Sequence, residues 1–222
     1  MIDKKENHFM IRDLIIFLLI VMNSSYSWAD KGGKQNNKPF LSLYVGKALG
    51  GNDDTAPSVV KDKEEDWDIG TGGSAVAGYK WGVFSLEAVY TSFGTSEANF
   101  NDYYKEKHRP FFVGGGLHWT FKFFDLKLGF GTGNDRVTYT QGPNSTTFST
   151  TPSGGKNSGA GSYLGFGFNI NLSPTTEFLI DYTGYNWEYS DSQTINVNGD
   201  TKVTDEPWTS MEMLSFGIRR FF

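Results

Sequence analysis

The last nine residues of the chain alternate between a mostly large, apolar set of side chains and a mostly small or polar set. One parity is Leu214, Phe216, Ile218, Arg220 and Phe222, and the other is Ser215, Gly217, Arg219 and Phe221. A period of two is that of a β-strand whose two faces meet different surroundings. In a transmembrane barrel one face of every strand contacts lipid and the other lines the lumen. The segment therefore predicts the closing strand of an outer-membrane barrel, with its large apolar face outward.

An apolar run near the amino terminus predicts export. Three basic residues precede the nine-residue run Leu14–Met22, and Ser27-Trp28-Ala29 follows it with small residues at its first and third positions. These are the parts of a secretory signal peptide, which we place at residues 1–29 with cleavage after Ala29. A membrane anchor is the alternative, but nine residues span only roughly 14 Å as a helix, against a hydrocarbon core of ~30 Å. We expect a polar leader at 30–37 and a barrel at 38–222.

Eight segments with period-two alternation predict strands. They lie at about Pro39–Lys47, Asp68–Lys80, Val83–Phe93, Pro110–Phe121, from Leu126, Ser162–Leu172, Glu177–Tyr185 and from Trp208. The connections after the second, fourth and sixth are short, whereas those at about 48–67, 94–109, 134–160 and 188–207 are long. This alternation is typical of outer-membrane barrels with long loops outside the cell. The prediction is an all-β, eight-stranded antiparallel up-and-down transmembrane barrel with short periplasmic turns. Within 134–160 we also expect a short hairpin, made by 137–141 and 147–151.

A water-soluble barrel of lipocalin type is the structural alternative, because it has the same alternation with the apolar face inside. Glycines occupy the polar parity at Gly70, Gly72, Gly114, Gly116, Gly129, Gly131, Gly165 and Gly167. Rows of glycine leave room for the other side chains in a crowded lumen, whereas on a water-facing surface they would serve no such purpose. The overall hydrophobic content of 38% is compatible with a membrane barrel, since only alternate residues touch lipid.

Charged side chains on the polar parity predict a filled lumen. The set consists of Lys80, Glu87, His118, Lys127, Asp181 and Arg219. Eight strands leave an interior just wide enough for side chains, and charges enclosed there must pair. We expect a charge network that plugs the barrel; a polar path for small solutes or ions is the alternative.

Aromatic side chains near the strand ends predict the two membrane interfaces. We place Tyr79, Trp81 and Trp119 at the periplasmic interface, and Trp187 and Trp208 at or above the outer one.

The composition argues against several kinds of functional site. The chain has no cysteine, which excludes disulfides, thiolate catalysis and cysteine metal sites. Its net charge of −5 gives no support to nucleic-acid binding. A calcium site in the acidic segment after the first strand lacks its glycine, because the sixth position counted from Asp62 is Trp67. We expect no cofactor and no metal.

The segments Phe40–Gly46, Phe84–Tyr90 and Gly217–Phe222 resemble the OmpA/OmpX-like superfamily of small outer-membrane β-barrels, which includes opacity-type and porin-family surface proteins. The resemblance covers nearly all of the mature chain. It implies a monomer in the Gram-negative outer membrane, among outer-membrane lipid and lipopolysaccharide. It also implies assembly by periplasmic chaperones and the barrel-insertion machinery, with Phe216, Ile218 and Phe222 as the carboxy-terminal insertion signal. Arg220 departs from the family pattern, which has an apolar residue there.

The expected function is a structural or surface-interaction role, in envelope integrity or adhesion, with the loops contacting an extracellular ligand. Some small barrels are lipid A-modifying enzymes, and the deacylases among them use a His and a Ser two residues apart with a distant Glu. Here His118-Trp119-Thr120 carries Thr in place of Ser, and His118 has the lumen parity, away from lipid. We therefore predict that the chain is not an enzyme.

Overall fold

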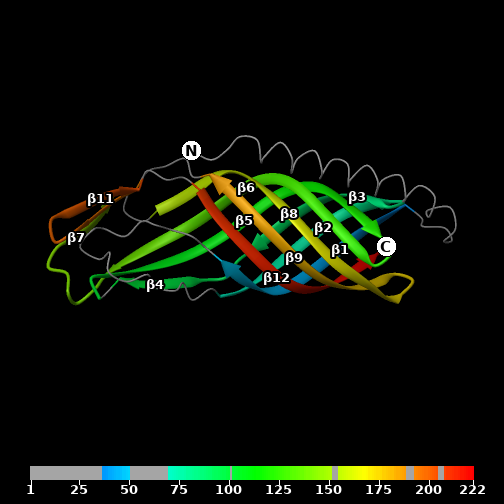
Figure 1. Ribbon diagram of the computed structural model, residues 1–222, viewed down its shortest axis with the longest axis horizontal. Coiled ribbons are helices and arrows are strands. Elements are labelled where there is room, and N and C mark those ends of the chain that lie inside the picture. The colour runs from blue at the N-terminus through cyan, green and yellow to red at the C-terminus, as the bar shows by residue number, and fades with distance from the viewer. Residues whose placement is uncertain (1–36, 51–69, 101, 152–154, 189–192, 205–207) are drawn as a thin grey trace, which may run out of the picture.

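Eight long strands close into an antiparallel barrel in the computed structural model, which describes residues 37–50, 70–100, 102–151, 155–188, 193–204 and 208–222 (Figure 1). The barrel strands are β1 (Lys38–Gly50), β2 (Thr71–Trp81), β3 (Phe84–Ser92), β5 (Tyr104–Phe121), β6 (Phe124–Gln141), β8 (Gly155–Ser173), β9 (Thr176–Glu188) and β12 (Trp208–Phe221). They pair in the order β3-β2-β1-β12-β9-β8-β6-β5, and β3 pairs with β5 to complete the ring. Closure removes the exposed edges of an open sheet. The predicted eight-stranded barrel is confirmed.

Two-residue turns join the strands at one end of the barrel, at 82–83, 122–123 and 174–175. Gly82 and Lys122 have positive φ angles of 63° and 54°, as tight hairpin turns require. The carboxy terminus lies at the same end, where the Phe222 amide donates a 3.1 Å hydrogen bond to the Pro39 carbonyl. The predicted short connections are confirmed. The predicted signal peptide, the leader up to residue 36 and the acidic segment within 51–69 lie outside the described residues.

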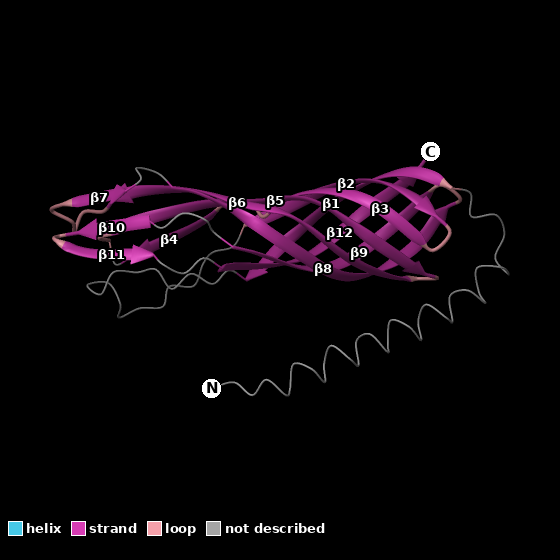
Figure 2. Ribbon diagram, turned by 90° about the horizontal axis from the view of Figure 1, so that it is seen from above, coloured by secondary structure: helices cyan, strands magenta, loops and turns pink. Residues whose placement is uncertain are grey.

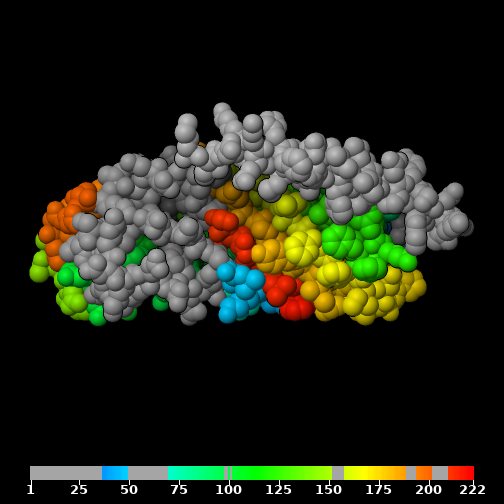
Figure 3. All heavy atoms as spheres, viewed as in Figure 1, coloured from blue at the N-terminus to red at the C-terminus, as the bar shows by residue number. Residues whose placement is uncertain are grey.

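The wall of the barrel is apolar on its outer face. Alternate residues of every barrel strand are exposed or half-buried, among them Leu43 (59% exposed), Phe130 (73%) and Ile218 (53%). Ser42 and Arg219, which have the opposite parity, are buried. A lipocalin-type barrel has the reverse arrangement, so that alternative is excluded for the described residues. This is the surface of a membrane-spanning barrel, and side chains of the blue, red and yellow strands lie side by side on it in Figure 3.

The described residues contain no helix that is long and apolar enough to cross a membrane.

Strands continue beyond the barrel on the side opposite the short turns (Figure 2). β5 and β6 have 18 residues each, whereas a tilted membrane strand needs only ~9–11. β4 (Ser96–Phe100) pairs with the upper part of β5, and β7 (Phe148–Thr151), β10 (Gln193–Val197) and β11 (Asp200–Thr204) form a separate three-stranded sheet. We call β4, β7, β10, β11 and residues 104–109 and 136–141 the head.

The head replaces most of what the sequence predicted as loops. The expected hairpin within 134–160 is wrong, because 137–141 belongs to β6 and pairs with β5, whereas 148–151 pairs with β10. The predicted loops 94–109 and 188–207 likewise contain β4, β10 and β11. The reason is that β5 and β6 extend past the membrane-facing wall and stay paired there. Burial still alternates along their upper parts, and the ladder between them continues without a break from Phe121↔Phe124 to Tyr104↔Gln141.

Aromatic and aliphatic side chains give the head its own core. Tyr104, Ile195 and Val197 are buried there, and partly buried aromatic rings pack around them. The Tyr104 ring stacks on Phe100 at a centroid distance of 4.6 Å and on Phe148 at 5.5 Å. The cluster joins residues of β4, β5, β7 and β10, and therefore holds the two sheets of the head together.

Candidate functional site in the barrel lumen

The half of the lumen next to the short turns contains charged side chains in contact with one another. His118, which is fully buried, places Nδ1 3.3 Å from Glu87 Oε2 and Nε2 3.2 Å from Asp125 Oδ2. Glu87 also accepts a 2.9 Å hydrogen bond from the Tyr163 hydroxyl, and Asn169 donates one of 2.9 Å to Asp125. These contacts connect β3, β5, β6 and β8 across the interior.

Arg219 of β12 extends the same set of contacts. Its Nη1 lies 2.8 Å from Glu177 Oε2, and its Nη2 lies 3.4 Å from both Asp125 Oδ2 and His118 Nδ1. The guanidinium also covers the Phe40 ring at 5.1 Å from its centroid. A buried charge is tolerated when its partners are themselves held in place, and here each carboxylate comes from a different strand.

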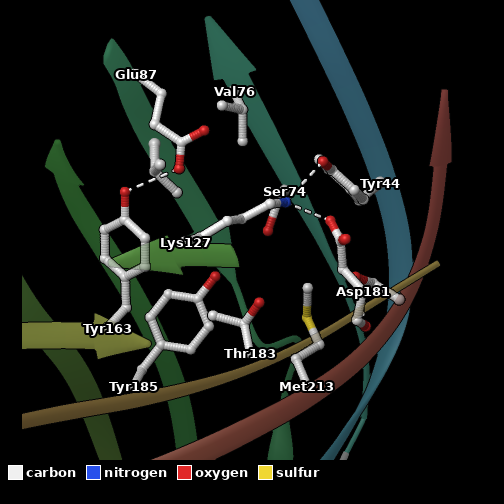
Figure 4. Close-up of a pocket in the computed structure, with 12 residues that line it drawn as sticks. Tyr44, Ser74, Val76, Glu87, Lys127, Tyr163, Asp181, Thr183, Tyr185 and Met213 are labelled. Carbon is white, nitrogen blue, oxygen red and sulfur yellow. Dashed lines mark hydrogen bonds and ion pairs between the residues drawn. The ribbon is translucent and has the colours of Figure 1, made fainter. Parts of the chain in front are cut away.

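Lys127 and Asp181 form a second ion pair nearer the middle of the barrel. Figure 4 shows the Lys127 ammonium between Asp181 and Tyr44, whose hydroxyl accepts a 2.9 Å hydrogen bond from it. Lys80, the remaining predicted residue, is buried with its ammonium 5.4 Å from the centroid of the Phe221 ring. All six predicted lumen residues thus lie inside. With Asp125 and Glu177 they make up what we call the charge network.

Aromatic rings fill the other half of the lumen, towards the head. We call this set the aromatic plug; it comprises Phe93, Phe112, Tyr163, Tyr185 and Trp187. Phe93 meets Tyr185 edge-on at 5.0 Å and stacks with Trp187 at 5.9 Å. Offset and edge-on contacts of this kind add to the stability that burial of the rings supplies. Charged side chains therefore occupy one half of the lumen, and aromatic rings occupy the other.

A small cavity remains between the two levels, bordered by Glu87, Lys127, Tyr163 and Asp181 (Figure 4). It offers about 20 Å³ to the centres of water-sized spheres, which is room for one or two water molecules. Among the described residues, the buried Asp181 Oδ1 has no hydrogen-bond partner, and an enclosed water molecule could supply one. The space is too small for an organic solute.

The predicted interfacial aromatics divide into three groups. Tyr79 and Trp81 point outward next to a short turn and are 45% and 41% exposed, while Trp119 is half-buried near the same end. The prediction for Trp187 is wrong, because its ring is 0% exposed and lies inside the barrel. On β9 the even-numbered residues, such as Tyr182 and Gly184, face outward. Trp187 is odd-numbered, so its side chain points into the barrel. The Trp208 side chain lies outside the described residues.

Sequence reasoning missed two members of the charge network and most of the aromatic plug. Asp125 precedes Lys127 by two residues, and Glu177 precedes Asp181 by four, so both share the lumen parity. Extending the alternation through the turns would have found them. Phe112 shares the parity of Gly114 and was identifiable in the same way.

A third group of charges lies at the base of the head, above the apolar wall. His108 donates hydrogen bonds from both ring nitrogens to carboxylates, with Nδ1 2.6 Å from Asp135 Oδ2 and Nε2 3.1 Å from Glu106 Oε2. Burial alone would lower the pKa of His108, but the hydrogen bonds and charges of Asp135 and Glu106 outweigh burial and raise the pKa to about 10. The described residues contain no group of three or more His, Cys, Asp and Glu side chains arranged to hold a metal ion.

The sequence matches no protein-family model and no curated protein. Among solved structures, the fold is similar to Neisserial surface protein A, at 14% identity over 86% of this chain and 100% of that one, with a TM-score of 0.44. It is also similar to Ail, the attachment invasion locus protein of Yersinia pestis, at 14% identity over 83% and 99%, with a TM-score of 0.46. A third is the outer membrane protein AlkL, at 16% identity over 86% and 93%, with a TM-score of 0.46. The names of these three proteins describe a surface protein, an attachment invasion locus protein and an outer membrane protein.

Proposed function

We propose that this chain is an outer-membrane protein that crosses the membrane as a plugged barrel and acts at the cell surface through its head. The observation that carries the proposal is the contrast between the two ends of the molecule. The lumen is filled by the charge network and the aromatic plug, whereas the head is a folded pair of sheets with its own core. A filled lumen does not favour transport, and a folded head offers a fixed surface to a partner.

The remaining parts of the proposal concern location and assembly. The chain would be exported by a signal peptide cleaved after Ala29 and inserted as a monomer by the barrel-insertion machinery. Phe216, Ile218 and Phe222 support this, since all three point outward at the end of the last strand, at 48%, 53% and 66% exposure. We assign the protein no catalytic role, because His118 is enclosed by Glu87, Asp125 and Arg219 and does not face lipid.

Single-channel recording tests whether the lumen is closed. Residues 30–222 are refolded in detergent and inserted into a planar bilayer, with folding checked by the shift in gel mobility on heating. We expect no discrete openings. Openings that change in the Glu87→Gln or Arg219→Ala variant would instead mean a narrow pore whose selectivity depends on the charge network.

Bacteria carrying the protein test the role of the head. In one variant a short Gly-Ser linker replaces 193–204, which removes β10 and β11 and leaves every barrel strand intact. We expect wild-type cells to be retained on protein-coated surfaces, and cells with this variant to be lost from them while keeping normal resistance to detergent. Equal retention of both strains, together with detergent sensitivity when the whole protein is deleted, would instead favour a purely structural role in the envelope.

A further inference from the structure

Two arginines lie directly opposite each other on the outer wall of the molecule, where the barrel meets the head. Arg109 of β5 pairs in register with Arg136 of β6, and both side chains are exposed. On the other side of β6, the backbone of Arg136 lies opposite that of Lys156 in β8. Side chains that oppose each other on antiparallel strands are close neighbours, and like charges in this arrangement destabilise the sheet. A bound anion would remove that repulsion.

The protein itself supplies no counter-ion to this pair within the described residues. The acidic side chain available on β4, Glu97, is engaged by Lys107 at 2.5 Å. Asp135 lies next to Arg136 in sequence but points inward, where it contacts His108. The adjacent outward positions on the two strands are Lys107, Phe111, Asn134 and Thr138. None of them carries a negative charge, so the two guanidinium groups face outward and no described side chain pairs with them.

The position of the pair indicates which anion would fit. Below Arg109 on the same face of β5 come Phe111 and Val113, the latter 46% exposed. Below Arg136 on the same face of β6 come the polar residues Asn134 and Thr132, and then Phe130, which is 73% exposed. The pair therefore lies at the outer edge of the apolar wall, at the depth of lipid headgroups. Guanidinium groups bind phosphate through paired, charge-assisted hydrogen bonds, and a phosphate on a lipid is brought to this depth by its acyl chains.

We propose that Arg109 and Arg136 bind a headgroup phosphate of an outer-leaflet lipid whose acyl chains lie along the wall at Phe111 and Val113. The inference rests on the proposed outer-membrane function and adds a specific lipid contact to it. The lipid would also screen the like charges, and so stabilise the junction between the barrel and the head.

Lipid binding is measured on the refolded chain 30–222 in detergent micelles, by native mass spectrometry with bisphosphorylated lipid A as the probe. The test variant is Arg109→Gln/Arg136→Gln. The matched control is Lys47→Gln/Lys105→Gln, which also removes two exposed cations at the outer end. Lys47 lies opposite Leu214 and Thr71, and Lys105 lies opposite Asn99 and Thr140, so neither has a like charge across the ladder.

We expect the test variant to lose roughly tenfold or more in affinity for lipid A, as loss of a charge-assisted bidentate contact implies, and the control to lose less than threefold. Lipid A without its phosphates should bind wild type as weakly as lipid A binds the test variant. Equal affinity of wild type and test variant would overturn the site. Equally tight binding of inorganic phosphate alone would overturn the lipid as its source. A chain that shows no heat-dependent gel shift in micelles would instead contradict the barrel function on which the inference rests.

Discussion

Glycine sets the limit on how closely strands and rings can pack in this lumen. A Cβ atom at Gly133 would overlap the Trp187 indole, and one at Gly129 would overlap the Tyr163 ring. Both rings belong to the aromatic plug, and both therefore depend on a missing side chain on β6. The glycine stripes that the sequence shows on the lumen parity thus have a steric cause, since they leave the width that large rings need in a narrow barrel.

Substitution of Gly133 tests this steric relation. Gly133→Ala should lower the free energy of unfolding by about 1–3 kcal/mol, because overpacking forces the ring or the backbone to shift. Urea unfolding of the vesicle-inserted barrel, followed by tryptophan fluorescence, measures the change. The control is Gly184→Ala on β9, whose added Cβ would meet, among the described residues, only the Leu164 carbonyl at 3.9 Å. Equal effects of the two substitutions would contradict the account.

Arg219 and Arg220 offer a comparison between neighbouring residues with opposite surroundings. Arg219 is 1% exposed and contacts Asp125 and Glu177, whereas Arg220 points outward. Arg219→Met should destabilise the barrel by about 3–5 kcal/mol, since it leaves buried carboxylates unpaired. Arg220→Met should change stability by less than about 1 kcal/mol, as expected for a site near the interface. Urea unfolding in vesicles measures both, and a similar cost for the two would show that the charge network is not stabilising.

At the scale of elements, the parity of the strands was predictable and their length was not. Alternation in Leu214–Phe222 identified β12 with its correct faces, because a one-residue slip would move every apolar side chain inward. Upper β5 and β6 carry polar residues such as Lys105 and Thr140 on their outer face, so the contrast between faces that marks a membrane strand disappears there. The head strands were hidden for the same reason.

One head element did carry a legible signal. Asn198-Gly199 forms the turn between β10 and β11, with positive φ angles of 53° and 88°, and Asn-Gly is a strong hairpin signal. Asn198 also accepts hydrogen bonds from the amides of Thr146 and Thr147 at 2.8 and 3.2 Å. The turn dipeptide was readable in the sequence, but this second contact joins segments about 50 residues apart and depends on the tertiary fold.

The charge group at the base of the head predicts a pH-dependent stability. Because the pKa of His108 is raised to about 10 in the folded state, above its unfolded value of about 6.5, its stabilising contribution is complete below about pH 6.5. That contribution is lost as the pH rises through about 10. We expect subtilisin to cleave the head faster at pH 10 than at pH 7, relative to an unstructured reference peptide. His108→Gln should be cleaved faster than wild type at pH 7 but show little further change, and an unchanged pH response in that variant would argue against the assignment.

At the scale of the whole molecule, the apolar wall makes a prediction that separates a membrane barrel from a soluble one. Phe130 is 73% exposed in the middle of β6. In a bilayer, Phe130→Arg should cost about 2–4 kcal/mol, as a cation at the midplane does. Thr140→Arg, at an outward position of the same strand in the head, should cost little. The two variants are compared by urea unfolding in vesicles, and equal stability would contradict a membrane position for this wall.

The continuous ladder between β5 and β6 has a mechanical consequence. These strands run unbroken from the turn at 122–123 to the head, with 18 paired positions, so no hinge separates the part that would meet a partner from the part held in lipid. A pull on the head directed along the strands would load many backbone hydrogen bonds in parallel, in shear, instead of opening them one at a time. Tension applied to upper β5 and β6 would thus pass into the barrel without these two strands separating first. With the surface role proposed above, a chain of this size could anchor a cell under flow.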